Sequence, residues 1–125
     1  MESILIKTAF RGIHCWPEAP EEVEFLRYPH RHIFRVEVVI DVVHSDRDVE
    51  FFLAQRDAER LILIIMGTAY NDHFGMNLIQ LGHQSCEMMA RALGLAMIKY
   101  HGYNILRCSV SEDGENEGNW SPDDQ

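Results

Sequence analysis

Hydrophobic and polar residues alternate in residues 3–11 and again in residues 30–43, which is the pattern of β-strands with one buried face. One face of the second stretch is an apolar row that begins with two imidazoles; its members are His30, His32, Phe34, Val36, Val38, Ile40 and Val42. The opposite face mixes charged and aliphatic side chains. We therefore predict a long strand whose core-facing row begins with a pair of histidines.

Two later segments have the spacing of amphipathic helices. Apolar residues recur with helical periodicity in residues 51–66 and in residues 86–100. Gly67 is expected to end the first helix, and Ser85 and Gly102 are expected to cap the two ends of the second. The apolar stripes predict that both helices pack on one face of the sheet.

The remaining segments are expected to hold one more strand and two loops. Residues 103–112 alternate as a strand, whereas residues 16–29 and 68–83 are expected to be loops. The acidic residues 113–125 are expected to be a frayed tail or one short edge strand. The order β-β-α-α-β, with or without a last strand, predicts an α+β fold with an antiparallel sheet, in a single domain over residues 1–125.

Composition narrows the classes of function. The net charge of −9 argues against binding to nucleic acid or to an anionic membrane surface. The longest apolar run, residues 61–66, is too short to cross a bilayer, and the chain does not begin with the basic segment of a secretion signal. Three cysteines without metal-binding or redox spacing favour free thiols in a reducing compartment, so we expect a cytoplasmic protein.

Three histidines are placed to share one metal ion. His30 and His32 point to the same side of their strand, and His14 has the parity of the apolar residues in the first strand. Imidazole is a common ligand of zinc, and three protein ligands leave the fourth position for water or substrate. Any one of these histidines alone would more simply be a hydrogen-bonded core residue or a solvated strand end. The three together predict a Zn²⁺ site.

Six short motifs occur in an order that resembles a known family. They are residues 10–14 (Phe-Arg-Gly-Ile-His), 30–32 (His-Arg-His), 48–51 (Asp-Val-Glu-Phe), 71–77 (Asn-Asp-His-Phe-Gly-Met-Asn), 85–87 (Ser-Cys-Glu) and 111–112 (Ser-Glu). They resemble the Phe-x-x-x-His, His-Gly-His, Val-x-Asp-Phe, Leu-Asp-His-x-x-Leu-Asn, Thr-Ser-Glu and strand-end Glu of the 6-pyruvoyltetrahydropterin synthase and 6-carboxytetrahydropterin synthase family. The resemblance implies the tunnelling fold (T-fold), β-β-α-α-β-β.

The resemblance also implies an activity and a set of site residues. The set is His14, His30 and His32 as zinc ligands, Asp72 and His73 as an acid–base pair, and Glu112, Ser85 and Glu87 for binding the pterin. The implied substrate is 7,8-dihydroneopterin triphosphate, whose side-chain hydroxyls zinc would acidify. The implied reaction is the lyase step to 6-carboxytetrahydropterin, on the way to queuosine and other 7-deazaguanines. The 6-pyruvoyl reaction is the alternative.

The chain departs from the family where a catalytic cysteine precedes the paired histidines. Leu26 and Glu24 occupy the two spacings at which the family carries it. Leu26 cannot transfer a proton, so Glu24 is the candidate base, although it lies in an acidic stretch that would equally be a solvated loop; Cys15 is a weaker substitute. Arg31 replaces the family's glycine between the histidines, where it would either crowd the substrate or hold its phosphates.

Three functions stay open from the sequence. One is the lyase, the second is a paralogue that binds zinc and a pterin but has lost turnover, and the third is a T-fold oligomer whose histidines hold adventitious metal. The presence of Asp72, His73 and Glu112 argues against the third, because a simple metal site needs none of them. The open edges of a sheet covered by two helices predict a homo-oligomer. The resemblance implies that this oligomer is a hexamer of two trimers.

Overall fold

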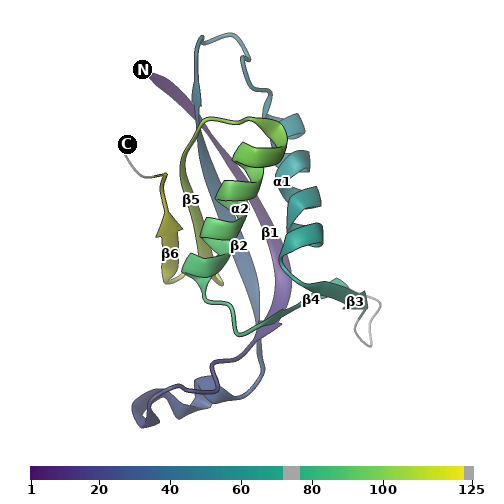
Figure 1. Ribbon diagram of the computed structural model, residues 1–125, viewed down its shortest axis with the longest axis vertical. Coiled ribbons are helices and arrows are strands. Elements are labelled where there is room, and N and C mark those ends of the chain that lie inside the picture. Colours follow the sequence, from purple (N-terminus) through teal and green to yellow (C-terminus); the bar gives the residue numbers. More distant parts are fainter. Residues whose placement is uncertain (72–76, 123–125) are drawn as a thin grey trace.

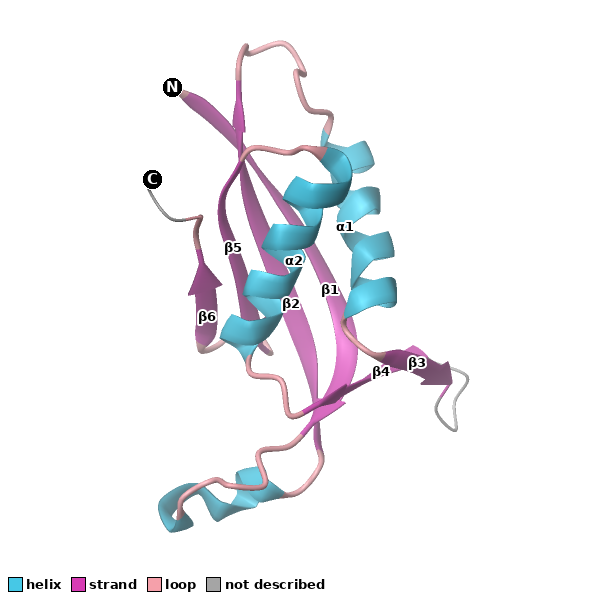
Figure 2. Ribbon diagram, viewed as in Figure 1, coloured by secondary structure: helices cyan, strands magenta, loops and turns pink. Residues whose placement is uncertain are grey.

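Six strands form one sheet in the order β3-β4-β1-β2-β5-β6, and two helices cover one of its faces (Figures 1 and 2). The computed structural model describes residues 1–71 and 77–122. The elements are β1 Glu2–His14, β2 His30–Val42, α1 Phe51–Ile65, β3 Thr68–Asn71, β4 Asn77–Gly82, α2 Cys86–His101, β5 Ile105–Glu112 and β6 Glu117–Trp120. The predicted α+β architecture, with both helices on one face of the sheet, is confirmed.

The two long strands β1 and β2 pair along their whole length and carry the core. They run antiparallel from the Glu2–Val42 pair to the His14–His30 pair. The apolar row of β2 is buried as its alternation predicts, with Phe34 and Ile40 fully inaccessible to solvent. β1 extends three residues beyond the predicted 3–11 stretch, which brings His14 into the ladder directly opposite His30.

Capping residues set the helix ends much as the sequence predicts. Ser85 precedes α2 and its hydroxyl accepts a hydrogen bond from the Met88 N–H, while Gly102 ends the helix in the left-handed conformation at φ +70°. In α1 the Glu50 carboxylate accepts a hydrogen bond from Leu53 N–H at 2.7 Å. Gly67, which follows α1, does not adopt the left-handed conformation. Glycine is needed at this position because a Cβ there would collide with the Gln80 carbonyl oxygen.

Two of the predicted loops contain regular structure. The segment 68–83 was expected to be a loop, but its described residues include β3 and β4, which pair with each other antiparallel, and β4 also pairs with β1 in parallel. The sheet is therefore not antiparallel throughout. The short apolar run of β4, whose Leu78 and Ile79 are buried, is too brief to be distinguished from a loop by its periodicity. The segment 16–29 contains the 3₁₀ helix Glu21–Arg27, and the tail forms β6, as one of the two expectations had it.

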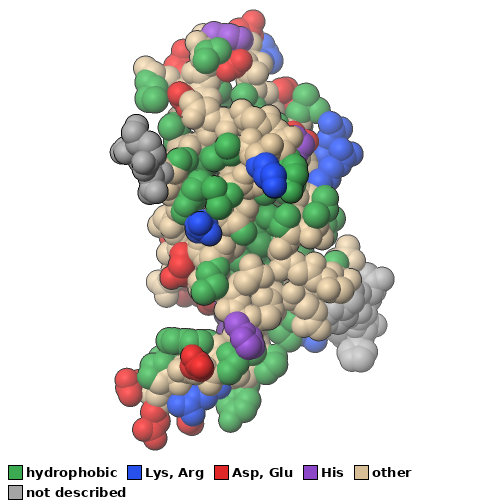
Figure 3. All heavy atoms as spheres, viewed as in Figure 1, with side chains coloured by type: hydrophobic (Ala, Val, Ile, Leu, Met, Phe, Trp, Pro, Cys, Tyr) green, Lys and Arg blue, Asp and Glu red, His purple; other side chains and the backbone are tan. Residues whose placement is uncertain are grey.

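The segment between β1 and β2 projects beyond the end of the sheet. Figures 1 and 3 show it as a separate protrusion that carries a group of acidic side chains. It leaves the sheet directly after His14 and returns at His30, so both histidines lie at its base. No helix in the described part of the chain is long and apolar enough to span a membrane.

Candidate metal centre and adjoining pocket

Four side chains from three neighbouring strands converge at the base of this protrusion. The potential ligand atoms of His14, His30, His32 and Glu112 all lie within 4.8 Å of one another. The sheet register explains the convergence, because His14 pairs with His30 in β1 and β2, and Glu112 pairs with Phe34 across β2 and β5. The three histidines predicted from strand parity are therefore brought together, and Glu112 joins them.

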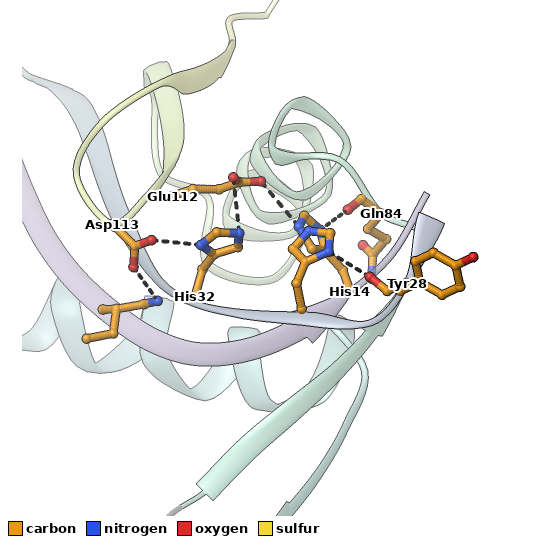
Figure 4. A network of polar contacts seen from close by, with 8 residues as sticks. His14, Tyr28, His32, Gln84, Glu112 and Asp113 are labelled. Atoms are coloured by element: carbon orange, nitrogen blue, oxygen red, sulfur yellow. Dashed lines mark hydrogen bonds and ion pairs between the residues drawn. The ribbon is translucent and has the colours of Figure 1, made fainter. Parts of the chain in front are cut away.

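Each imidazole is held in place through its Nδ1 atom. The Nδ1 of His14 lies 2.8 Å from the Gln84 carbonyl oxygen, and that of His30 lies 2.8 Å from the Tyr28 carbonyl oxygen. The Nδ1 of His32 lies 2.7 Å from the Asp113 carboxylate (Figure 4). Because carbonyl and carboxylate oxygens only accept hydrogen bonds, all three rings donate from Nδ1. In the neutral form each ring then presents the lone pair of Nε2.

These lone pairs lack ordinary partners within the described structure. The Nε2 of His30 is buried and has no hydrogen-bond partner there. The Nε2 of His14 lies 3.2 Å from Glu112 Oε1, and that of His32 lies 3.3 Å from Glu112 Oε2 (Figure 4). If the rings are neutral, each of these two contacts joins two acceptors and is unfavourable. A cation among the four groups satisfies all of them, and imidazole with carboxylate is a donor set that zinc accepts.

Burial favours the neutral form of His14 that a metal ligand needs. His14 is only 9% exposed, and this burial lowers its pKa below the usual value of 6.5, with the neighbouring His30 adding to the effect. The hydrogen bond to the Gln84 carbonyl opposes the shift without cancelling it. At neutral pH the ring is therefore a base with a free Nε2.

Asp113 is a functional residue that the sequence reasoning missed. One carboxylate oxygen accepts the hydrogen bond from His32, and the other accepts one from the Ile33 N–H at 2.9 Å. These two hydrogen bonds lower the pKa of Asp113, which keeps it ionised. Metal-ligating histidines commonly donate to such a carboxylate, which fixes the ring and raises its basicity. An Asp-Gly turn directly after the strand-end Glu112 was the available signal.

A pocket of about 530 Å³ adjoins the cluster. Its lining includes Trp16, Leu26, Ser85, Cys86, Glu87 and Glu117, together with His14, His30 and Glu112. The expected pterin-binding residues Ser85, Glu87 and Glu112 thus border one cavity. Burial, with Glu112 and Glu87 nearby, raises the pKa of Cys86 to about 12, so this cysteine is a thiol and not a thiolate at neutral pH.

Positive charge lies in a second, smaller pocket. Among the lining residues that the structure describes, the large pocket has three carboxylates and neither lysine nor arginine. Arg11 and Arg31 instead line a cavity of about 190 Å³ together with His32 and Asp113. His32 therefore borders both the metal cluster and the cavity with the arginines.

The structure does not bring Glu24 to the cluster. Glu24 lies on the protruding 3₁₀ helix with its side chain 65% exposed, 3.8 Å from the Arg27 guanidinium, and it does not line the large pocket. In the structure the acidic stretch that holds Glu24 is therefore a solvated surface, which was the alternative expectation for it. Asp72 and His73 lie outside the described residues.

Comparisons with known proteins agree on the fold. No protein-family model and no curated protein matches the sequence. The structure is similar to 6-pyruvoyl tetrahydropterin synthase from Caenorhabditis elegans, with a TM-score of 0.64 and 9% identity over 98% of this chain and 96% of the other. It is similar to a Plasmodium vivax 6-pyruvoyltetrahydropterin synthase with a catalytic glutamate replaced by alanine (TM-score 0.58, 12% identity, 98% of both chains). An uncharacterized protein from Wolinella succinogenes gives a TM-score of 0.60 at 11% identity over 98% of both chains. The chain therefore has the fold of the 6-pyruvoyltetrahydropterin synthases, which confirms the predicted T-fold.

Proposed function

We propose that this protein is a metal-dependent lyase of the tetrahydropterin synthase class that acts on the side chain of a reduced pterin. One observation carries the proposal: three imidazoles with Nε2 lone pairs meet Glu112 beside a 530 Å³ pocket, on a fold shared with 6-pyruvoyltetrahydropterin synthases. A structural zinc site would need no such pocket, and a pterin is of a size that this cavity admits.

Different residues of the chain are proposed to bind the metal ion, to orient its ligands and to contact the pterin. His14, His30 and His32 hold the metal ion, and their Nδ1 hydrogen bonds keep the rings oriented. When bound, a divalent ion there acts as a Lewis acid toward the side-chain hydroxyls of the substrate. Trp16 and Leu26 give the pocket apolar walls for the pterin ring, while Ser85 and Glu87 give it polar groups. Asp72 and His73 are proposed, from the resemblance, to move protons.

The finer assignment is proposed on the resemblance. We infer zinc as the metal, 7,8-dihydroneopterin triphosphate as the substrate and 6-carboxytetrahydropterin as the product, in the synthesis of 7-deazaguanines. The described lining of the large pocket has no lysine or arginine, and we propose Arg11 and Arg31, which line a separate small cavity together with His32, as the cations for the triphosphate. The cytoplasmic location and the hexamer of two trimers stay predictions, and β3 and β6 are the sheet edges available for pairing between subunits.

A non-catalytic pterin-binding protein is the second candidate. Leu26 lines the pocket where the family would place its cysteine, and Cys86 holds its proton. The P. vivax synthase has a catalytic glutamate, so a catalytic carboxylate has a precedent on this fold, and Glu24 is the candidate by spacing. The exposed position of Glu24 beside Arg27 is the observation that favours the non-catalytic alternative.

Incubation of zinc-loaded protein with 7,8-dihydroneopterin triphosphate, followed by mass analysis of the pterins, tests the proposal. We expect 6-carboxytetrahydropterin from the wild type and none from His30→Ala. The pyruvoyl product would support the sister reaction. Binding without turnover would support the non-catalytic candidate, and a lack of both binding and turnover would contradict a pterin function.

A further inference from the structure

Within residues 1–71 and 77–122, Glu112 is the one carboxylate whose two oxygens both contact the histidines of the cluster. Its Oε1 lies 3.2 Å from His14 Nε2 and its Oε2 lies 3.3 Å from His32 Nε2. The sequence resemblance implies that Glu112 binds the pterin ring. The proposed function does not specify what Glu112 contacts in the protein without a bound pterin. On the basis of that proposed function, we propose that Glu112 is the fourth metal ligand in the ligand-free protein and that a pterin must displace it.

The four side chains are close enough to share one ion, since their candidate ligand atoms all lie within 4.8 Å of one another. Zinc binds imidazole nitrogen and carboxylate oxygen at about 2.0–2.2 Å, so two ligands of one tetrahedral ion lie roughly 3.3–3.5 Å apart. The two contacts of Glu112 are close to this separation. Direct hydrogen bonds between neutral rings and the carboxylate do not explain them, since His14 and His32 already donate from Nδ1.

The same carboxylate cannot serve the metal and the pterin fully at one time. Both of its oxygens are directed at the histidines, so a pterin's amino and ring N–H groups would compete with the metal ion for the same two oxygens, and a paired contact to both oxygens is best made with the carboxylate turned toward the pocket. Closed four-ligand sites are typical of structural zinc, whereas catalytic sites keep one position open. Movement of Glu112 would convert one kind of site into the other.

The structure leaves room for this movement. The Glu112 side chain is 35% exposed and borders the large pocket, so one side of the carboxylate meets open space. The imidazoles are held by the Gln84 carbonyl, the Tyr28 carbonyl and Asp113, none of which depends on Glu112. The three histidines can therefore keep the ion while Glu112 leaves it.

Cobalt(II) substitution tests the ligation directly. Wild type, Glu112→Gln and Glu117→Gln are loaded with Co²⁺, and visible absorption and the Co²⁺ dissociation constant are measured by competition with a chelator. Glu117 lines the same pocket outside the ligand cluster, so its variant is the matched control. We expect Glu112→Gln to weaken Co²⁺ binding at least about tenfold and to change the spectrum, because an amide oxygen is a poorer ligand than a carboxylate. Unchanged affinity and spectrum in a folded Glu112→Gln protein would overturn the ligation.

Titration of the Co²⁺ protein with 7,8-dihydroneopterin tests the displacement. We expect the wild-type spectrum to change as the pterin binds, and the change at saturating pterin to be smaller in Glu112→Gln, where no carboxylate is lost. Pterin binding with an unchanged wild-type spectrum would overturn the displacement. If the pterin does not bind at all, the proposed function and the displacement both fail, whereas the measured effect of Glu112→Gln on metal affinity still decides the ligation.

Discussion

The carboxylate of Glu112 lies 3.2 Å from the Nε2 atom of His14, although their strands β5 and β1 are separated in the sheet by β2. The contact spans β2 because the histidines of β1 and β2 project from the helix-covered face at the end where β5 also finishes. A buried imidazole with lowered pKa facing a carboxylate is an unfavourable pair unless a cation lies with them.

Asp113 is expected to support the metal site through His32. Asp113→Asn retains the shape and weakens the hydrogen bond to His32 Nδ1, so metal affinity should fall by about 10–100-fold. Chelator competition measures the change. Glu115→Gln, an exposed change in the same turn, is the control and should leave affinity unaltered. Equal affinities in both variants would show that Asp113 only stabilises the turn.

The metal-free protein should lose stability as the pH falls below the usual imidazole pKa. The pKa of His14 is lower in the folded chain than in the unfolded chain, where it is near 6.5. The unfolded state therefore takes up its proton first, and the free energy of unfolding decreases below about pH 6.5, by at most about 1.4 kcal/mol per pH unit for one proton. Denaturant unfolding in chelator at pH 7.5 and 5.5 measures this. His14→Gln should flatten the dependence, and an equally steep profile in that variant would refute the assignment.

The sequence predicted the parts of the fold that depend on long, regular patterns. The alternation of residues 30–43 and the stripes of the two helices correspond to β2, α1 and α2 because burial on one face dictates their spacing. The antiparallel pair of β3 and β4 was missed, since strands this short gain their stability from β1 and not from their own pattern.

The candidate site was predictable only as far as strand parity reaches. Strand parity predicted that His14, His30 and His32 lie on one face of the sheet. The register of β1 and β2 confirms that their side chains lie close together. The position of Glu112 against them depends on which strand neighbours β2, which no local pattern encodes. The Gln84 and Tyr28 carbonyls that orient the rings are backbone groups, which carry no signature in the sequence.

Glu24 should have little influence on turnover. Its side chain is 65% exposed and paired with Arg27, away from the large pocket, so Glu24→Gln is expected to change kcat by less than about threefold. Steady-state kinetics with metal-loaded protein give the answer. A loss of a hundredfold or more would instead place Glu24 in the reaction, as expected of a general base.

Arg31 should matter for phosphate-bearing ligands. Arg31 and His32 both line the small cavity. Arg31→Ala is therefore expected to raise the KM for 7,8-dihydroneopterin triphosphate about tenfold. Binding of unphosphorylated dihydroneopterin should stay unchanged. Arg60→Ala, an exposed change on α1, is the control. Equal effects on both ligands would mean that Arg31 does not contact phosphate.

The zinc content of the purified protein tests the central claim most directly. Elemental analysis compares the wild type, His30→Ala and His44→Ala. His44 is exposed and lies in the loop after β2, at the opposite end of this strand from His30. We predict close to one equivalent of zinc per chain in the wild type and in His44→Ala, and close to none in His30→Ala. Equal zinc content in all three proteins would contradict a metal centre at His14, His30 and His32.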